Sequence, residues 1–176
     1  IIKGELKLDF SRYDDWMIKQ DKVMLLLFYS TGINLSQLVE IDEADLKLNQ
    51  KKIKVAGVAG KEYKSRSISF CNQTGKAIKS FLQDRKNYLD INTIDKPLFI
   101  SKQGIRISKS IVQTRLNKFF ANTSGSSGFT SKFLRNLFAT HLYDKGLNKS
   151  EIKNLLIEHI DLFISKEGKL NELYQL

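Results

Sequence analysis

The stretch from residue 131 to residue 142, S-K-F-L-R-N-L-F-A-T-H-L, constrains the fold more than any other part of the chain. Its spacing predicts an amphipathic helix whose buried stripe is formed by the apolar residues on one side, Leu134, Leu137, Phe138 and Leu142. Lys132 and Arg135 stand three residues apart. Residues at this spacing are neighbours on a helix surface, so we expect both charged heads to be able to reach a single anion.

The composition excludes several classes of protein. The chain has 176 residues, enough for one domain with a proper core, and 41% of them are hydrophobic, which excludes wholesale disorder. Lys and Arg number 29 against 19 Asp and Glu, which gives a formal net charge of +10. An excess of this kind favours a phosphate polymer such as nucleic acid as the partner. The alternative is a soluble protein that is merely basic.

The residue types that bind metals, form disulfides or cross membranes are scarce. Cys71 is the only cysteine, so no disulfide framework and no cysteine-based metal cluster can form. His141 and His159 are the only histidines, and they lack zinc-ligand companions. The longest apolar run, 23–29, is too short to span a bilayer, and residues 1–4 do not read as a signal peptide. We therefore expect a cytoplasmic protein that needs no metal and no cofactor.

Helical spacing dominates the first forty residues. We expect a short helix within residues 6–20. Asp21 is expected to cap a second helix over residues 22–30, which is apolar on all sides and therefore buried. Gly32 then supplies the left-handed residue that ends this helix, and a helical turn follows over residues 33–38.

A period of two residues replaces the helical period after residue 44. Three strands of a small antiparallel sheet are expected, over residues 45–48, 53–56 and 66–70. A helix should follow from a cap at Asn72 to about residue 89. The chain is thus expected to be mainly α with a small antiparallel β-sheet, an α+β fold, in a single domain over residues 1–176.

Turn residues divide the second half of the chain. After a short extended piece over residues 97–101, Ser108 is expected to cap a helix that carries five apolar positions. Residues 124–128, S-G-S-S-G, have the composition of a flexible linker, and the same composition would suit an engineered loop. The central helix at residues 131–142 should begin after this linker.

The end of the central helix is marked by Gly146, a residue typical of the position just past a helix. Asn148 and Glu151 have the spacing of a capping box, which predicts one more helix over residues 151–157. The tail beyond it, from residue 159 to the end, is amphipathic but weakly patterned.

Together these motifs resemble the tyrosine recombinases, the phage-integrase family, from about residue 22 to residue 159. The second box of that family is a His, Lys or Tyr three positions before an Arg, followed by His-x-Phe-Ala-Thr-His-Leu. Here Lys132, Arg135 and F-A-T-H-L at residues 138–142 resemble that box. The resemblance implies that Arg135 clamps a phosphate and that Lys132 helps to deprotonate a nucleophile.

The first box of the family, Thr-Gly-Leu-Arg-x-Ser-Glu-Leu, resembles residues 31–38, T-G-I-N-L-S-Q-L. Asn34 stands where the family has its first catalytic arginine. A hairpin motif, Gly-Lys-Gly-Asn-Lys-x-Arg, resembles residues 60–66 and makes Lys61 the candidate that protonates the leaving 5′-oxygen.

The third box, Leu-Leu-Gly-His, is similar to residues 155–159 with one residue inserted, which makes His159 the third-box candidate. Gly168 stands where the family usually has its nucleophilic tyrosine. Tyr174 is the only tyrosine beyond the third box, so it is the candidate nucleophile.

The resemblance implies a tyrosine-recombinase catalytic-domain fold without the core-binding domain that usually precedes it. The implied function is that of a site-specific recombinase or integrase, as encoded by mobile elements or used to resolve chromosome dimers. Such an enzyme binds double-stranded DNA, cleaves it and rejoins it through a 3′-phosphotyrosine intermediate, without metal or cofactor. It also implies self-association, or a partner recombinase, on DNA.

Two other functions stay open. Losing one arginine of the clamp would cost on the order of 10²–10⁵ in rate, so Asn34 also suits a catalytically impaired module that only binds DNA. The third possibility is an unrelated basic helical protein that binds nucleic acid. Each candidate also has a structural interpretation: an arginine can form an ion pair, a lysine can face solvent or touch a DNA backbone, and His141, His159 and Tyr174 can simply pack.

Overall fold

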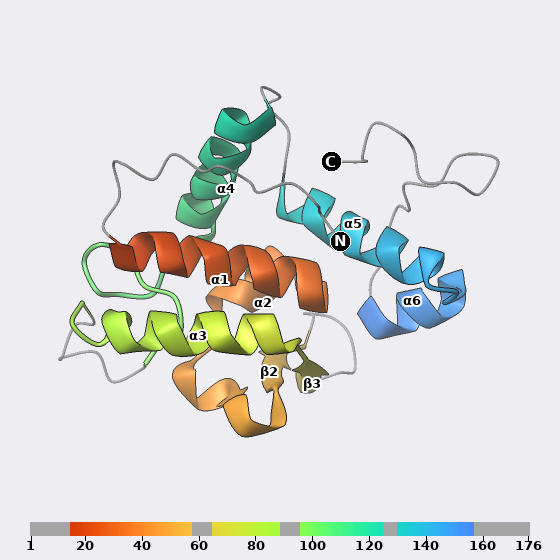
Figure 1. The fold of residues 1–176 in the computed structure, drawn as a ribbon, viewed down its shortest axis with the longest axis horizontal. Coiled ribbons are helices and arrows are strands. Elements are labelled where there is room, and N and C mark those ends of the chain that lie inside the picture. The colour runs from red at the N-terminus through yellow and green to blue at the C-terminus, as the bar shows by residue number, and fades with distance from the viewer. Residues whose placement is uncertain (1–14, 58–64, 89–95, 125–129, 157–176) are drawn as a thin grey trace.

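The computed structural model describes residues 15–57, 65–88, 96–124 and 130–156, and of residues 120–124 only the backbone. Its helices are α1 (Asp15–Thr31), α2 (Leu35–Val39), α3 (Asn72–Arg85), α4 (Lys109–Ser124), α5 (Ser131–Asp144) and α6 (Lys149–Leu156). Its strands are β1 (Leu46–Lys47), β2 (Lys52–Ala56) and β3 (Ser65–Ser69), with the 3₁₀ turns η1 (Glu43–Asp45) and η2 (Leu48–Gln50) around β1. The predicted fold class, mainly α with a small antiparallel sheet, is confirmed (Figure 1).

The sheet has the order β1-β2-β3 with both pairs antiparallel. Along β2, Ile53 and Val55 are buried while their neighbours are exposed, so one side of the sheet faces the core. The first strand is shorter than predicted because residues 48–50 wind into η2, which ends at Lys51 with a left-handed backbone (φ 53°). The third strand begins one residue earlier than predicted.

Helix α1 corrects the prediction of two helices divided at Asp21. The helix runs without a break from residue 15 to residue 31, and Asp21 lies in its interior. The Asp21 carboxylate pairs with Arg115 of α4, with 2.7 Å between Oδ1 and Nε. A residue type that favours helix caps is thus used for a contact between helices. Gly32 ends the helix with a φ of 62°, as predicted.

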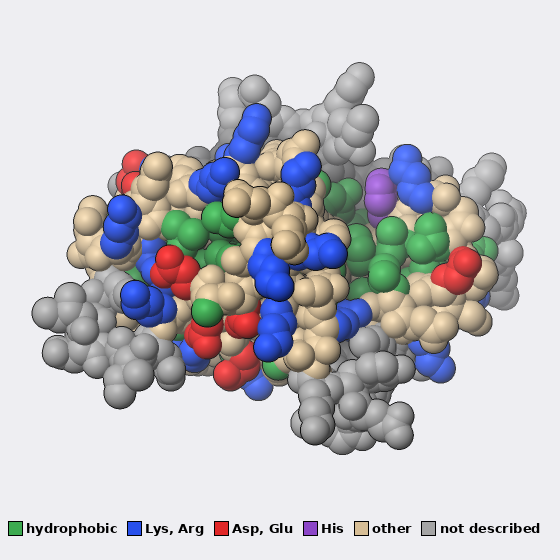
Figure 2. Space-filling model, turned by 90° about the horizontal axis from the view of Figure 1, so that it is seen from below, with side chains coloured by type: hydrophobic (Ala, Val, Ile, Leu, Met, Phe, Trp, Pro, Cys, Tyr) green, Lys and Arg blue, Asp and Glu red, His purple; other side chains and the backbone are tan. Residues whose placement is uncertain are grey.

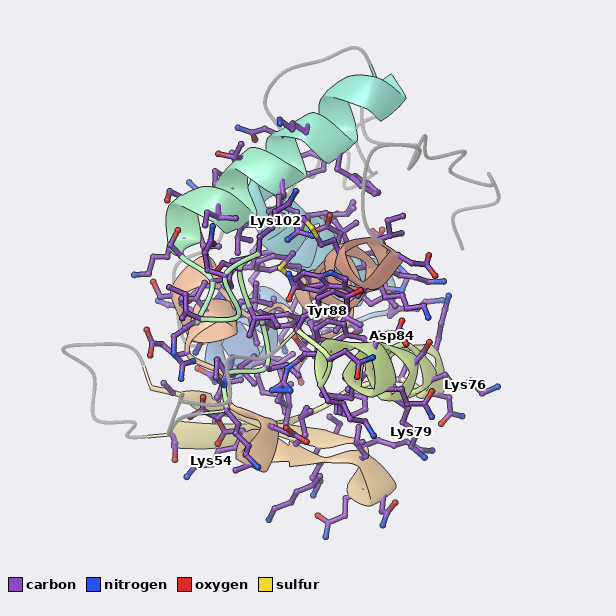
Figure 3. All side chains as sticks on the ribbon, turned by 90° about the vertical axis from the view of Figure 1, so that its left-hand side faces the viewer. Lys54, Lys76, Lys79, Asp84, Tyr88 and Lys102 are labelled. Carbon is purple, nitrogen blue, oxygen red and sulfur yellow. The ribbon has the colours of Figure 1, made fainter. Side chains whose placement is uncertain are left out.

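The core is built around α1, which packs against α3 on one side and α5 on another. The sheet lies on the same side of α1 as α3, and α4 stands on the opposite side, as Figures 1 and 3 both show. A smaller apolar cluster joins α5 to α6 and contains Ala139, Ile152 and Leu156 as its buried members. Helices α5 and α6 therefore form a pair that is docked on α1 through α5.

Two predicted caps are confirmed and one is shifted. The Ser108 hydroxyl accepts a hydrogen bond from the Ile111 amide at 3.3 Å. Asn148 and Glu151 form both bonds of a capping box, at 2.7 and 3.0 Å. The residue that caps α3, however, is Cys71, because Asn72 already has its place in the first turn. Helix α6 starts at residue 149, two residues before its predicted start.

A buried arginine fixes the extended segment that follows α3. Arg85 is only 2% exposed; its Nε donates to the carbonyl of Leu98 at 3.0 Å, and its Nη2 donates to the carbonyl of Pro97 at 2.7 Å. Its guanidinium also pairs with the Glu43 carboxylate at 3.4 Å. Two residues further, the amide side chain of Gln20 forms two bonds of 2.9 Å with the backbone of Ile100. The extended piece predicted at residues 97–101 is thus anchored to α1, α3 and η1.

Gly146 ends α5 with a φ of 97°, as predicted for a residue just past a helix. Within the described ranges, no helix combines the length and the apolar character needed to cross a bilayer. The predicted linker at residues 124–128 and the tail from residue 159 lie outside the described residues, except that Ser124 closes α4.

Candidate active site

Helix α5 carries the second box, and its buried face is broader than the predicted stripe. Leu134 is buried as predicted, but Leu137, Phe138 and Leu142 are only partly buried. The remaining buried positions are Arg135, Asn136, Ala139 and Thr140. Helix α5 contacts both α1 and α6, and a helix held between two neighbours buries more than one stripe. Arg135, a charged residue, is thereby turned into the protein.

The guanidinium of Arg135 joins three segments that are far apart in the sequence. Its Nη1 donates to the carbonyl of Gly32 at 2.7 Å, and its Nη2 donates to the carbonyl of Leu156 at 2.6 Å. Gly32 lies in the first box, and Leu156 is the last residue of α6, inside the third box. Carbonyls at the end of a helix lack partners within the helix, and a charged donor satisfies them well. We call this meeting point of three boxes the Arg135 junction.

The turn at Gly32 is pressed tightly against the junction. A Cβ atom added at Gly32 would lie 2.5 Å from a side-chain carbon of Leu156 and 2.5 Å from one of Phe138. Contacts this short do not occur in proteins, so any other residue at this position would force the side chains of Leu156 and Phe138 to shift. The left-handed backbone at Gly32 imposes the same choice.

Asn34, which stands at the position of the first family arginine, caps α2. Its side-chain Oδ1 accepts a hydrogen bond from the Gln37 amide at 2.8 Å, and its own amide donates to the Gln37 side chain at 3.1 Å. Asparagine is among the best N-cap residues, which gives this substitution a local structural benefit. It supplies no positive charge to the junction.

The β2–β3 hairpin is held against the same region from two sides. The Gln37 side chain donates to the carbonyl of Ala56 at the end of β2 at 2.9 Å. Arg66 in β3 donates from Nη1 to the carbonyl of Leu155 in α6. Lys61 belongs to the connection between these strands and lies outside the described residues. The two strand ends that flank it lie beside α2 and the end of α6.

Arg66 and Gln37 are the residues that the sequence analysis did not single out. Both stand inside the matched motifs, as the last residue of the hairpin motif and the seventh of the first box. Their positions in those motifs were the signal that could have identified them. With Arg135, Arg66 makes two arginines that hold the adjacent carbonyls of residues 155 and 156.

The other site candidates are only partly placed. Lys132 is exposed on the first turn of α5, whereas Arg135 is only 4% exposed, and a shared anion for the two stays a prediction. His159 and Tyr174 lie outside the described residues. His141 is half-buried, with its ring centroid 6.2 Å from that of Tyr29, which agrees with a packed histidine.

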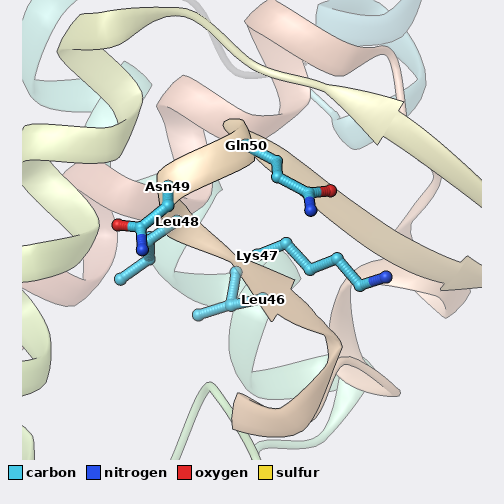
Figure 4. Close-up of a pocket in the computed structure, with 5 residues that line it drawn as sticks. All are labelled: Leu46, Lys47, Leu48, Asn49 and Gln50. Carbon is cyan, nitrogen blue, oxygen red and sulfur yellow. The ribbon is translucent and has the colours of Figure 1, made fainter.

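The described part of the chain holds no cluster of metal ligands, and a pocket found in it lies away from the matched motifs. No group of three His, Cys, Asp or Glu side chains gathers there as ligands for a metal. Figure 4 shows a pocket lined by residues 46–50, at the β1 edge of the sheet and not at the β3 edge that reaches α6. This pocket contains no residue of the four matched motifs.

Comparison with known proteins places the whole arrangement in one family. The model of the phage integrase family matches residues 8–162. The chain is 32% identical over 143 residues to tyrosine recombinase XerC of Vibrio cholerae, covering 81% of this chain and 44% of that protein. It is 34% identical over 155 residues to XerC of Psychromonas ingrahamii, covering 88% of this chain and 50% of that protein. The chain therefore spans about half the length of these relatives.

Solved structures give the same result for the fold. The crystal structure of XerA recombinase matches with a TM-score of 0.67 at 21% identity, covering 82% of this chain and 54% of that one. A structure of XerH site-specific recombinase bound to its palindromic difH substrate matches with a TM-score of 0.69 at 17% identity, covering 84% and 41%. The chain therefore belongs to the phage integrase family, the tyrosine recombinases, and has the fold of their catalytic domains.

Proposed function

We propose that this chain is the catalytic domain of a site-specific tyrosine recombinase that binds duplex DNA, cleaves it and rejoins it. The observation that carries the proposal is the Arg135 junction, where segments of three family boxes meet at one guanidinium. The net charge of +10 suits a DNA partner. The matched relatives are themselves named tyrosine recombinases, and the matched XerH structure is a complex with its DNA substrate after cleavage.

The proposed reaction exchanges one phosphodiester for another. The Tyr174 oxygen attacks the scissile phosphorus, a 3′-phosphotyrosine bond forms, and the bond from phosphorus to the 5′-oxygen breaks. Lys61 donates a proton to that oxygen, which would otherwise leave as a poor alkoxide, and Lys132 accepts the proton of the tyrosine. A 5′-hydroxyl then reverses the step on a new strand. The phosphotyrosine bond retains the energy of the broken phosphodiester bond, so the reaction needs no external energy source.

Arg135 and His159 would stabilise the charge that develops on the non-bridging oxygens. Donors that are fixed before the reaction are the most effective, because they need no reorganisation as charge builds up. A guanidinium has five N–H donors, so one arginine can hold two carbonyls and also donate to a phosphate oxygen. In this proposal the bonds to Gly32 and Leu156 hold the Arg135 head in place.

Asn34 would contribute one hydrogen bond where the family has a full charge, which makes it the weakest part of the proposed site. We expect cleavage that is slow for this class and that Asn34→Arg accelerates, at the cost of the α2 cap. The enzyme would act on DNA in the cytoplasm, as a self-associated complex or with a partner recombinase. We also propose that a mobile element encodes the protein, as is the case for the integrases of this family.

Covalent capture tests the proposal. The protein is incubated with a library of randomised duplexes that each carry a nick, and DNA that stays attached in detergent is recovered and sequenced. A duplex bearing the recovered sequence then gives the rate of trapping. We expect Tyr174→Phe to abolish trapping, whereas Tyr88→Phe, an exposed tyrosine beyond α3, leaves it unchanged. Arg135→Lys should lower the rate by about 10²–10³ because it removes the forked donor.

The outcomes separate the possible functions. Trapping that survives Tyr174→Phe contradicts the assigned nucleophile. A wild-type chain that binds duplex DNA without trapping, and that traps once Asn34 is replaced by Arg, is a catalytically impaired module. Absence of DNA binding by the folded chain contradicts the proposal altogether, and a thermal melt of each variant establishes that it is folded.

A further inference from the structure

The solvent-facing side of the small sheet has an unusual composition. On β2, Lys52 and Lys54 are exposed while Ile53 and Val55 face the core. Their register partners Lys47, Ser67 and Ser69 extend this side, because residues directly opposite each other point the same way. Ser65, opposite the exposed Ala56 at the end of β2, continues it. We call the result the lysine face, and its members are Lys47, Lys52, Lys54, Ser65, Ser67 and Ser69.

The positive charges on this face repel one another and destabilise the sheet. Lys47 lies directly opposite Lys52 in the ladder, and like charges in this position repel. Lys54 follows two residues along the same strand, at about 6.8 Å. In the described part of the chain, the ion pairs involve Lys19, Arg85, Arg106 and Arg115, and none includes a lysine of this face. A partner that brings negative charge would relieve the repulsion.

The partner that fits this spacing is a nucleic-acid backbone. Lysines repeat along β2 at about 6.8 Å, which is about twice the 3.4 Å axial spacing of phosphates on one DNA strand. Three serines lie across from them or beside them, and their short side chains leave room for a phosphate while offering hydroxyl donors. Bulky apolar side chains, which a protein partner would be expected to need, are missing from the six positions of the face.

The lysine face adjoins the candidate active site through one hairpin. Arg66, on the inner side of β3, donates to the carbonyl of Leu155 in α6, while Ser65 and Ser67 beside it point to solvent. The face therefore starts at the hairpin end that lies near the Arg135 junction and extends along the sheet away from it. Figure 3 places Lys54 on the opposite side of the molecule from Lys102 and α4.

Figure 2 views the molecule from below and shows several Lys and Arg side chains running down its middle, with others on both flanks and acidic side chains beside them. We propose that the lysine face is a separate phosphate-contact surface, which binds duplex DNA beyond the position where the strand is cut. This inference rests on the proposed function for its partner, but it concerns binding and not the cleavage chemistry.

The experiment replaces Lys47, Lys52 and Lys54 together by Gln. The matched control replaces Lys76, Lys79 and Lys86 of α3 and its C-cap, which are also exposed, so both variants lose the same charge. Affinity for a fluorescent duplex is measured from about 50 to about 200 mM salt, because each phosphate contact adds about 0.9 to the slope of log K against log salt. We expect the slope of the lysine-face variant to fall by about 2 to 3 and that of the control by less than about 1.

Further measurements make the result decisive. With DNA in excess, the rate of covalent trapping should be the same in both variants and in the wild type. The melting temperature of the lysine-face variant should not fall, because a repulsive pair has been removed. Equal changes of slope in the two variants, or no change in either, would contradict the lysine face while leaving the proposed function intact. Loss of affinity for polyglutamate but not for the duplex would point to an acidic protein instead, and this too overturns the inference.

Discussion

Two buried arginines in this chain use the same contacts for different purposes. Arg85 and Arg135 are 2% and 4% exposed, and each donates to backbone carbonyls of two residues. Arg85 binds residues only 12 and 13 positions away and is balanced by the Glu43 carboxylate. Burial lowers its pKa and the charge of Glu43 raises it, with burial the larger influence. It is the anchor of one connecting segment.

The acceptors of Arg135 lie 103 and 21 positions away, and both belong to matched boxes. A substitution at Arg85 would disturb a connection, whereas one at Arg135 would disturb the relation between the boxes themselves. The difference is that Arg135 joins the matched boxes to one another, and in the proposed function it would also serve the chemistry from the same position. It also means that loss of activity at Arg135 does not by itself separate the two roles.

Arg85→Met should give the largest loss of stability and thereby sharpen the comparison. The substitution leaves the carbonyls of Pro97 and Leu98 without their donor and the Glu43 charge without its partner. A buried carbonyl left without a donor costs about 1–3 kcal/mol, and two of them are affected, whereas the Glu43 side chain is 45% exposed and adds little; urea unfolding would measure the loss. The rate of covalent trapping per folded molecule should stay unchanged.

The adjacent exposed Lys86 supplies the control for this substitution. Lys86→Met is expected to change the free energy of unfolding by no more than about 0.5 kcal/mol, as is usual for surface positions. Arg85→Met could lower the free energy of unfolding no more than Lys86→Met does, or it could slow trapping by the folded protein. Either result would contradict the distinction between Arg85 as an anchor and Arg135 as a brace of the site.

Gly32→Ala should have the next largest effect and acts on the junction itself. The new Cβ would lie 2.5 Å from carbons of Phe138 and Leu156 and would sit on a left-handed backbone. Overpacking costs about 1–3 kcal/mol and the backbone conformation about 1–2 kcal/mol more. We expect relief of these contacts to displace the carbonyl of Gly32 from Arg135, so the trapping rate should fall together with the stability.

Gly146→Ala separates the two contributions to that loss. Gly146 also has a positive φ, of 97°, but no atom lies within 4 Å of a Cβ added there. We expect it to lose only the backbone contribution, measured by the same urea unfolding, and to trap DNA at the wild-type rate. Equal losses in the two glycine variants would show that close packing at the junction contributes little.

Local sequence signals predicted the parts of the fold that local interactions determine. The glycine that ends α1 and the caps at Ser108 and Asn148 each depend on residues within four positions of one another, and the sheet pairs strands that follow one another along the chain. The break predicted at Asp21 failed because the partner of its carboxylate, Arg115, lies 94 positions further along the chain (115 − 21). Neither the cap preference of Asp nor the spacing around it carries information about such a partner.

The same limit applies to the candidate site. The motif letters indicated that Gly32, Arg135 and Leu156 belong to matched boxes, but they did not predict the inward direction of Arg135, because an arginine on a helix is normally solvated. Its acceptors are backbone carbonyls, which leave no mark on the sequence. Lys61, His159 and Tyr174 lie outside the described residues, and their roles stay predictions.

Arg115 extends the comparison to a third arginine, and it gives the smallest expected effect. Its Nη2 donates to the carbonyl of Met17 at 2.8 Å, and its Nε pairs with Asp21 at 2.7 Å. Burial raises the pKa of the Asp21 carboxyl above its usual value, although the charge of Arg115 acts in the opposite direction. The folded protein therefore binds the proton of Asp21 more tightly than the unfolded chain does.

The contribution of Asp21 to the free energy of unfolding should consequently fall as pH rises. Below the usual pKa of an aspartate both states are protonated, and the contribution of Asp21 is constant. Between that value and the higher pKa of the folded state, the folded protein holds more protons, so the free energy of unfolding decreases with rising pH. Urea unfolding of the wild type and of Asp21→Asn should be compared across mildly acidic pH. The free energy of unfolding of the wild type should fall relative to that of Asp21→Asn as the pH rises towards neutrality. The opposite trend would mean that the ion pair with Arg115 outweighs burial in setting the pKa of the Asp21 carboxyl.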